Sequence, residues 1–269
     1  MDLAAEPWDA GEQDLMRSHR RAMDALAPSD VFSEPVLSRD GRLAWRLPEK
    51  VDLGGVARKS PNGMRLDSRA RADGGDVEPD PAVLQEAVRH GRSAVDVILS
   101  WADLRGADLT GLMADGLDLS WTQLDNASLQ RAKITGGSFD SANLGQTVFD
   151  QASIEDSSFD CSIAGGATWQ GVTIERCTFA GAELAGSDFG QATISESSFD
   201  AAMLGQARFD RSALRGCSFA NADCSGASFA GATLRRVDFD GADLRGASFE
   251  GAVLDEVSFE GAQRDAGQQ

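Results

Sequence analysis

The chain of 269 residues contains no tyrosine, two histidines and four cysteines, so it has few side chains for acid–base, nucleophilic or metal chemistry. Neither His19 nor His90 lies in a recognisable catalytic motif. No phosphate loop, zinc-ligand spacing or nucleophile elbow is present either. The sequence therefore argues against an enzyme and indicates neither a cofactor nor a bound metal.

Long apolar runs and excess positive charge are also missing. No stretch of about 18 apolar residues occurs, and the opening residues MDLAAEPWDAGEQDLM lack the basic and apolar regions of a secretory signal. The 25 basic residues are outnumbered by 43 acidic ones, which gives a formal net charge of -18. Such a chain repels phosphates and anionic lipids. We expect a cytoplasmic protein that binds neither nucleic acid nor membrane.

A period of five residues runs from Leu99 to Phe259. Every fifth position is uncharged and usually Leu, Ile or Phe, and the residue two places before it is nearly always small. This period matches neither the 3.6 residues of a helical turn nor the alternation of a strand. It fits a solenoid with five-residue sides, in which two side chains of every five point inward and each coil is covered by its neighbours.

The repeated motif, A-[D/N]-L-x-x or A-x-F-x-x, resembles that of the pentapeptide-repeat family. Clear copies are Ala107-Asp108-Leu109, Ala142-Asn143-Leu144, Ala222-Asp223-Cys224 and Ala242-Asp243-Leu244. The resemblance covers residues 94–262. It implies an all-β solenoid, a right-handed quadrilateral β-helix of about eight coils with about 20 residues in each.

A coil of about 20 residues predicts where the aromatic residues lie. Every phenylalanine except Phe32 falls into one of two series with a spacing of 20 residues, on opposite sides of the coil. One series contains Phe179, Phe199 and Phe219. With coils about 4.8 Å apart, the rings should stack into two continuous columns inside the tube.

The pattern divides the chain into four parts. These are an N-terminal extension, small and mostly helical or partly disordered, with an amphipathic helix and a Gly/Arg/Pro-rich linker (1–79), a capping helix (80–93), the β-helix (94–262) and a polar tail (263–269). The extension also contains a weak hairpin pattern around Asp40-Gly41.

The two ends of the solenoid differ in sequence. Asp80 is the expected N-cap of the short helix, Pro81 its first-turn residue and Gly91 its C′ residue, and this helix should cover the first coil. The last coil has no comparable cap, so we expect it to meet a second copy or another protein. The candidate residues of this end-to-end interface are Leu244, Phe249, Leu254 and Phe259.

Two sets of outward residues are candidates for partner binding. Trp101 and Trp121 lie one coil apart in the same outward position, where they either anchor a partner or are covered by the N-terminal segment. Acidic residues form a second set, which either binds a partner or keeps the β surface soluble. One acidic column contains Asp140, Asp160, Asp200, Asp240 and Glu260, and an adjacent side contains Glu155, Asp156, Glu175 and Glu196.

The functional interpretation is a non-enzymatic scaffold or adaptor that binds a protein. Pentapeptide repeats preceded by a helix similar to PAVLQEAVRHGRS occur in bacterial secretion-associated proteins, notably near type VI systems, which implies an association with such a system. The alternative also comes from the family resemblance. Its acidic, quinolone-resistance members resemble duplex DNA and bind DNA gyrase or topoisomerase IV in place of DNA, which protects these enzymes from topoisomerase poisons.

Overall fold

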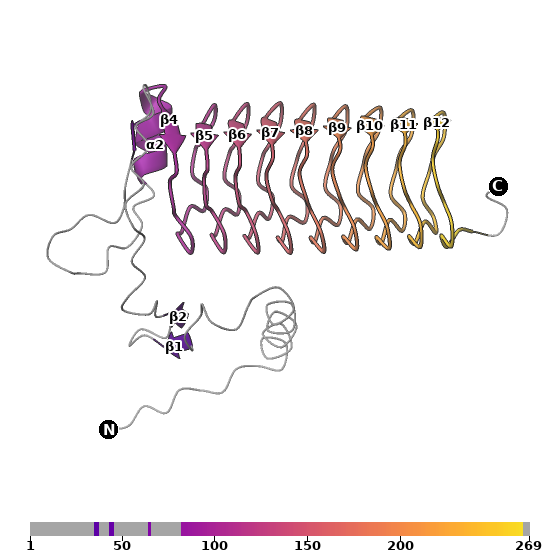
Figure 1. The fold of residues 1–269 in the computed structure, drawn as a ribbon, viewed down its shortest axis with the longest axis horizontal. Coiled ribbons are helices and arrows are strands. Elements are labelled where there is room, and N and C mark those ends of the chain that lie inside the picture. Colours follow the sequence, from indigo (N-terminus) through magenta and orange to yellow (C-terminus); the bar gives the residue numbers. More distant parts are fainter. Residues whose placement is uncertain (1–34, 38–42, 46–63, 66–81, 266–269) are drawn as a thin grey trace, which may run out of the picture. The chain divides into compact units, whose positions relative to one another are not determined.

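The computed structural model describes residues 35–37, 43–45, 64–65 and 82–265, and the chain divides into two compact units, Met1–Lys59 and Ser60–Gln269 (Figure 1). In the first unit, β1 (Pro35–Leu37) pairs antiparallel with β2 (Leu43–Trp45). The expected hairpin is therefore present, although its turn lies outside the described residues.

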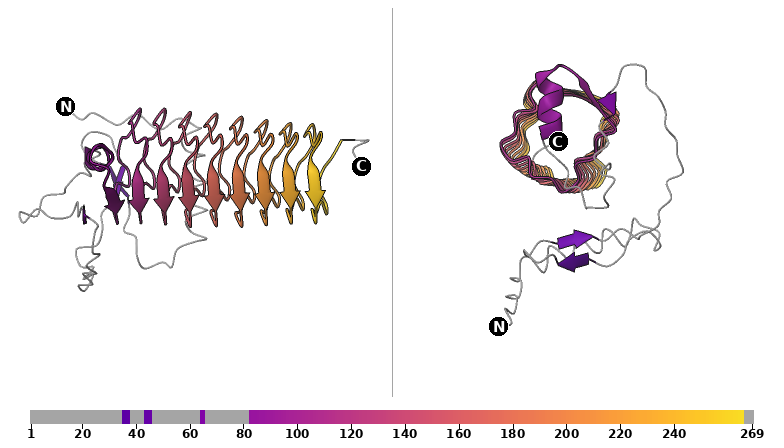
Figure 2. Two further views of the ribbon diagram at one scale, coloured as in Figure 1. Left: turned by 90° about the horizontal axis from the view of Figure 1, so that it is seen from above. Right: turned by 90° about the vertical axis from the view of Figure 1, so that its left-hand side faces the viewer.

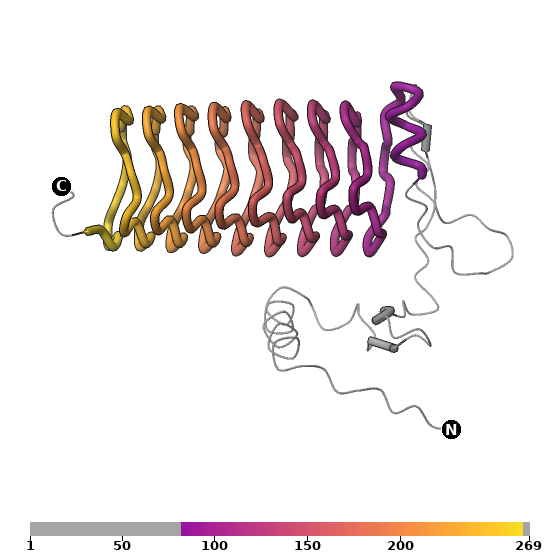
Figure 3. Tube along the Cα trace, turned by 180° about the vertical axis from the view of Figure 1, so that it is seen from behind, coloured from indigo at the N-terminus to yellow at the C-terminus, as the bar shows by residue number. Residues whose placement is uncertain are grey.

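The second unit is a parallel β-solenoid of about eight coils, as the repeat predicts (Figures 1 and 3). Ten strands form one sheet in the order β12 to β3, and residues 20 apart are partners, as Ile134 and Ile154 are. The strands are β3 (Met64–Arg65), β4 (Ser93–Val95), β5 (Met113–Asp115), β6 (Lys133–Thr135), β7 (Ser153–Glu155), β8 (Thr173–Glu175), β9 (Thr193–Ser195), β10 (Ala213–Arg215), β11 (Thr233–Arg235) and β12 (Val253–Asp255).

Each coil has four sides. The sheet forms one of them, and each of the other three carries a row of isolated parallel bridges between residues that are 20 apart. We call the side that holds β4–β12 the strand side. The other three are the Phe139 side, the Leu144 side and the Phe149 side, named after one of their inward residues. Figure 2 shows the four sides enclosing a single narrow interior.

Every corner of a coil is a residue in the left-handed region. These residues recur every five positions, and both glycines and larger side chains occupy them. At a typical corner, Trp101 has φ 70° and the Ala102 amide donates to the Leu99 carbonyl over 3.0 Å, which is a type II turn. A left-handed residue at each corner lets the chain turn inward again after only five residues.

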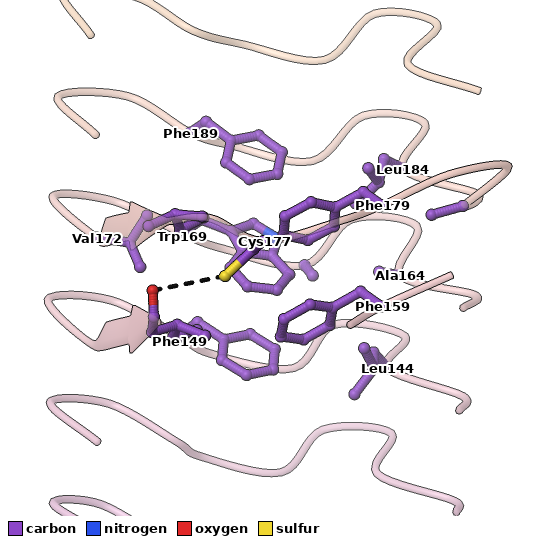
Figure 4. Close-up of a cluster of buried hydrophobic side chains, with 14 of the residues drawn as sticks. Leu144, Phe149, Phe159, Ala164, Trp169, Val172, Cys177, Phe179, Leu184 and Phe189 are labelled. Carbon is purple, nitrogen blue, oxygen red and sulfur yellow. Dashed lines mark hydrogen bonds between the residues drawn. The ribbon is translucent and has the colours of Figure 1, made fainter. Parts of the chain in front are cut away.

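The interior confirms the two predicted aromatic columns (Figure 4). Ring centroids of Phe179 and Phe199 are 4.7 Å apart, and those of Phe199 and Phe219 are 4.8 Å apart, with nearly parallel planes. The two columns touch edge to face, as Phe199 and Phe209 do at 6.1 Å and 89°. Both geometries are favourable for aromatic rings, so the columns form the centre of the core.

A helix covers the first coil. α2 (Ala82–Arg89) crosses the open end of the solenoid, and its Leu84 and Ala87 are buried (Figure 2). Gly91 has φ 59°, and the bonds from Gly91 N to Val88 O and from Arg92 N to Ala87 O form a Schellman motif. The predicted C′ glycine is confirmed. The predicted N-terminal residues of this helix, Asp80 and Pro81, lie outside the described residues.

One element was not expected. Met64–Arg65 forms β3, which pairs in parallel with β4 and adds a strand to the sheet beyond the first coil. The sequence around it is rich in Gly, Arg and Asp and carries neither the five-residue period nor an apolar alternation. A strand of two residues is too short to give a pattern, so only the neighbouring sheet reveals it.

Candidate protein-interaction surfaces

The structure stacks the two outward tryptophans on each other. Trp101 and Trp121 occupy successive coils at the corner between the Phe139 and Leu144 sides, with ring centroids 5.0 Å apart and planes 5° from parallel. Trp101 is 50% exposed, and Ile98 beside it is 41% exposed. An apolar patch of this kind is a typical anchor for a binding partner.

Backbone conformation makes this pair unusual. Both tryptophans lie in the left-handed region, with φ 70° for Trp101 and 62° for Trp121. A side chain with a Cβ costs about 1–2 kcal/mol there, and a bulky aromatic is especially uncommon in this region. Glycine fills the same corner at Gly181 and Gly241. Since the fold accepts glycine at this corner, folding alone does not explain two stacked tryptophans there, one of them exposed.

The acidic column on the Phe139 side is bonded into the structure. Asp140 accepts a hydrogen bond from the Ser158 hydroxyl and one of 3.1 Å from the Asp160 amide. Asp160 accepts bonds from the next coil in the same way, from the Thr178 hydroxyl at 2.7 Å and the Ala180 amide at 2.8 Å. The same arrangement recurs at Asp200 and Asp240, whereas Glu260 is exposed at the end of the column. These carboxylates thus hold neighbouring coils together.

This bonding predicts a loss of stability in acid. The hydroxyl of Ser258 and the amide of Glu260 lower the pKa of Asp240 in the folded protein. Protonation therefore favours the unfolded chain, and the stabilisation is present above the ordinary aspartate pKa of about 4 and disappears as the pH falls through the lowered value. We expect the urea midpoint to be constant from about pH 7 to about pH 5 and to fall below about pH 4.

In Asp240→Asn the urea midpoint should fall less steeply at low pH than in the unmodified protein. Glu250→Gln is the matched control, because the Glu250 side chain accepts no hydrogen bond within the described residues. An equal fall of the urea midpoint at low pH in both variants would show that the bonds to Asp240 do not couple its protonation to folding.

The second acidic group contains a cation that the sequence did not reveal. Arg176 lies beside three of its carboxylates: its Nε is 2.7 Å from Asp156, one guanidinium nitrogen is 3.6 Å from Glu155, and another contacts Glu175. The guanidinium lowers the pKa of Asp156 through a hydrogen bond and its charge. Glu196, the fourth member, is 3.8 Å from Arg236. This group is therefore a network of both charges.

The C-terminal end is only partly open. Leu254 is 47% exposed and Phe249 and Phe259 are half-buried, with Arg264 lying over the Phe259 ring at 4.9 Å. Leu244 is fully buried, contrary to the expectation that it is uncovered, because the following segment returns over it and the Leu244 amide donates to the Gln263 carbonyl. The exposed apolar surface of this end is therefore smaller than expected.

The cysteines and acidic residues show no sign of redox or metal chemistry in the described part of the chain. All four cysteines are free, and burial raises the pKa of Cys177 and Cys217 to about 11 and that of Cys224 to about 12. Such thiols remain protonated near neutral pH. Among the described residues no group of His, Cys, Asp or Glu could hold a metal ion, and no helix is long and apolar enough to cross a membrane.

Comparison with protein families identifies the repeat in two segments. A family model described as a pentapeptide repeat region matches residues 192–266, and one described as pentapeptide repeats (8 copies) matches residues 102–140. No curated protein matches the chain.

Three similar solved structures illustrate the range of matches. A trypsin-treated form of QnrB1, a plasmid-mediated fluoroquinolone resistance protein, has 18% identity and a TM-score of 0.38, covering 64% of this chain and 90% of its own. HetL, a pentapeptide repeat protein involved in heterocyst differentiation regulation from the cyanobacterium Nostoc sp. strain PCC 7120, has 20% identity, a TM-score of 0.25 and coverages of 69% and 97%. Rfr23, a pentapeptide repeat protein from the cyanobacterium Cyanothece 51142, has 12% identity, a TM-score of 0.17 and coverages of 68% and 99%.

Proposed function

Because the chain belongs to the pentapeptide-repeat family, we propose that its β-helix is a non-enzymatic scaffold or adaptor that binds a protein partner in the cytoplasm. The stacked pair formed by the exposed Trp101 and the half-buried Trp121 is the observation that carries this proposal. Four free cysteines suit a reducing compartment. The proposal includes an association with a bacterial secretion system, which the helix before the repeats implies. The burial of Leu84 also gives this helix a structural role as a cap.

A rigid rod suits this role for an energetic reason. Successive coils are joined by regular backbone hydrogen bonds on all four sides, and the interior is filled by stacked rings. A surface that is already ordered loses little conformational entropy when a partner binds. The tryptophan pair can therefore contribute most of its buried apolar area to affinity.

The test is the double variant Trp101→Ala/Trp121→Ala. Loss of two aromatic anchors should weaken the partner's binding by about 2 kcal/mol or more, which is roughly 30-fold. The measurement is quantitative cross-linking and pull-down from the native host, with circular dichroism to show that the fold is retained.

Met203→Ala is the matched control, since Met203 is 44% exposed on the Leu144 side, well away from the pair. A protein retained by the unmodified chain and by the Met203 variant, but lost from the double variant, supports the proposal. If every retained protein binds all three equally, the tryptophan pair is not the binding site.

The alternative function is DNA mimicry directed at DNA gyrase or topoisomerase IV. The regular acidic column on the Phe139 side favours it. Against it, these carboxylates are committed to hydrogen bonds between coils, and Arg176 lies within the other acidic group. Inhibition of gyrase supercoiling by the purified protein at micromolar concentration would establish mimicry, and its absence would leave the scaffold as the better account.

A further inference from the structure

Charges on the strand side change sign along the solenoid. The third residues of β7 to β11 form one outward column with a spacing of one coil, and they are Glu155, Glu175, Ser195, Arg215 and Arg235. Two acidic residues are thus followed by a neutral one and then by two basic ones. The order is antisymmetric in charge about Ser195.

In the corner column next to it only the outermost pair follows this order, because Arg176, Glu196 and Gly216 lie between them. Asp156 lies directly after β7 and Arg236 directly after β11, so these residues are also two coils before and two coils after β9. Their side chains are about half exposed. The outward residues at the start of the strands around β9 are small and uncharged, so no large or charged side chain stands there. They are Thr173, Thr193 and Ala213.

We propose that the strand side binds the strand side of a second copy of this chain, with the two solenoids antiparallel. The two-fold axis lies in the interface, parallel to the strands, and passes through β9. Under this operation Glu155 faces Arg235 of the other copy and Glu175 faces Arg215. In the corner column Asp156 faces Arg236. Each contact occurs twice, as the isologous geometry of a two-fold dimer requires.

Other registers fit the charges less well. Moving the axis by half a coil toward β8 leaves Glu155 opposite Arg215 but places Asp115 opposite Asp255. Moving it by half a coil toward β10 places Glu155 opposite Asp255. Like charges that face each other disfavour both alternatives. In the proposed register Asp255 faces Thr135, next to Lys133, and the only like pair is Glu196 with itself, which Arg236 partly neutralises at 3.8 Å.

A surface complementary in charge to the strand side would carry the same charges in reversed order along the coils. A second, antiparallel copy of this chain presents that order, so it explains this surface better than an unrelated partner. Within the described residues, Arg215 takes part in no ion pair. The overlap of β6 to β12 is about 30 Å by 13 Å, or roughly 400 Å² per copy. This is below the size of most stable interfaces, so the dimer is weak and dissociates as salt screens the charges.

The test is sedimentation equilibrium from about 1 µM to about 1 mM protein at about 20 mM and about 500 mM salt. We expect dimerisation only at low salt. Glu175→Arg and Arg215→Glu should each weaken it by tenfold or more, and the double variant Glu175→Arg/Arg215→Glu should restore it because the exchanged charges still face each other. The single variants change the net charge of -18 in opposite directions, so non-specific repulsion cannot weaken both.

Two controls separate this interface from others. Glu183→Arg has the charge change of Glu175→Arg in the same coil but on the Leu144 side, and Leu254→Asp disrupts the C-terminal end. Both should dimerise normally. A dimer lost in Leu254→Asp but kept in Glu175→Arg would overturn the proposal, as would a monomer at every concentration and salt. None of these outcomes bears on the tryptophan surface, which lies on a different corner.

Cross-linking tests the register directly. In a Cys161→Ser background, Ser195→Cys places the two thiols on the axis, whereas Ser153→Cys separates them by four coils, about 19 Å. A short bis-maleimide should join Ser195→Cys protomers and not Ser153→Cys protomers. Equal cross-linking of both would contradict the antiparallel register through β9.

Discussion

Phe199→Ala should lower the free energy of unfolding by about 3–5 kcal/mol, the range measured for truncation of a fully buried phenylalanine. Phe199 has no exposed surface and touches four rings: Phe179 and Phe219 in its own column at 4.7 and 4.8 Å, and Phe189 and Phe209 edge to face at 5.9 and 6.1 Å. Since the coils are tied by backbone hydrogen bonds on both sides, they cannot collapse into the cavity. Urea denaturation followed by circular dichroism measures the change.

Phe259→Ala is the matched control at the end of the same column. Phe259 is half-buried, stacks on only one ring of its own column, Phe239 at 5.5 Å, and touches Phe249 edge to face. Its truncation should cost clearly less, about 1–2 kcal/mol. Equal losses at Phe199 and Phe259 would mean that stability does not depend on continuous stacking through the middle of the rod.

The column itself was predictable from the sequence, whereas its surroundings were not. Phe179, Phe199 and Phe219 are spaced by one coil, and inward residues that share a side must stack once the coils are stacked. The corners and the C′ role of Gly91 follow equally from local rules, because a short chain turn needs a left-handed residue. These features depend on periodicity and local conformation, and both are visible in a single sequence.

The interactions between coils depend on details that the period does not encode. Arg176 is 20 residues from Asp156, and its long side chain could equally have pointed into solvent. The bonding of Asp140 to Ser158 follows from a spacing of 18 residues, a signal present in the sequence as the recurring order Ser-Phe-Asp but meaningful only when the register is known. Burial of Leu244 likewise depends on the path of the chain around Gln263, where the sequence carries no apolar pattern.

Leu84→Asp should lower the free energy of unfolding by about 3 kcal/mol or more, because it removes a buried side chain and places a carboxylate where no water can reach it. Leu84 has no exposed surface and belongs to the same buried cluster as Ala94 and Leu99. In a solenoid each coil is stabilised mainly by its neighbours. Loss of the helix should therefore leave the first coil open on one side, and unfolding should begin there.

Hydrogen exchange distinguishes this outcome from general destabilisation. In Leu84→Asp the amides of Leu99 and Leu104, which donate to the Asp118 and Gln123 carbonyls of the next coil, should lose protection first, and that of Phe199 should lose it last. Gln85→Asp is the control, since it adds the same charge to the exposed face of α2 and should leave protection unchanged. Uniform loss along the rod would mean that the solenoid unfolds as one cooperative unit. Unchanged protection at Leu99 would mean that α2 does not cap it.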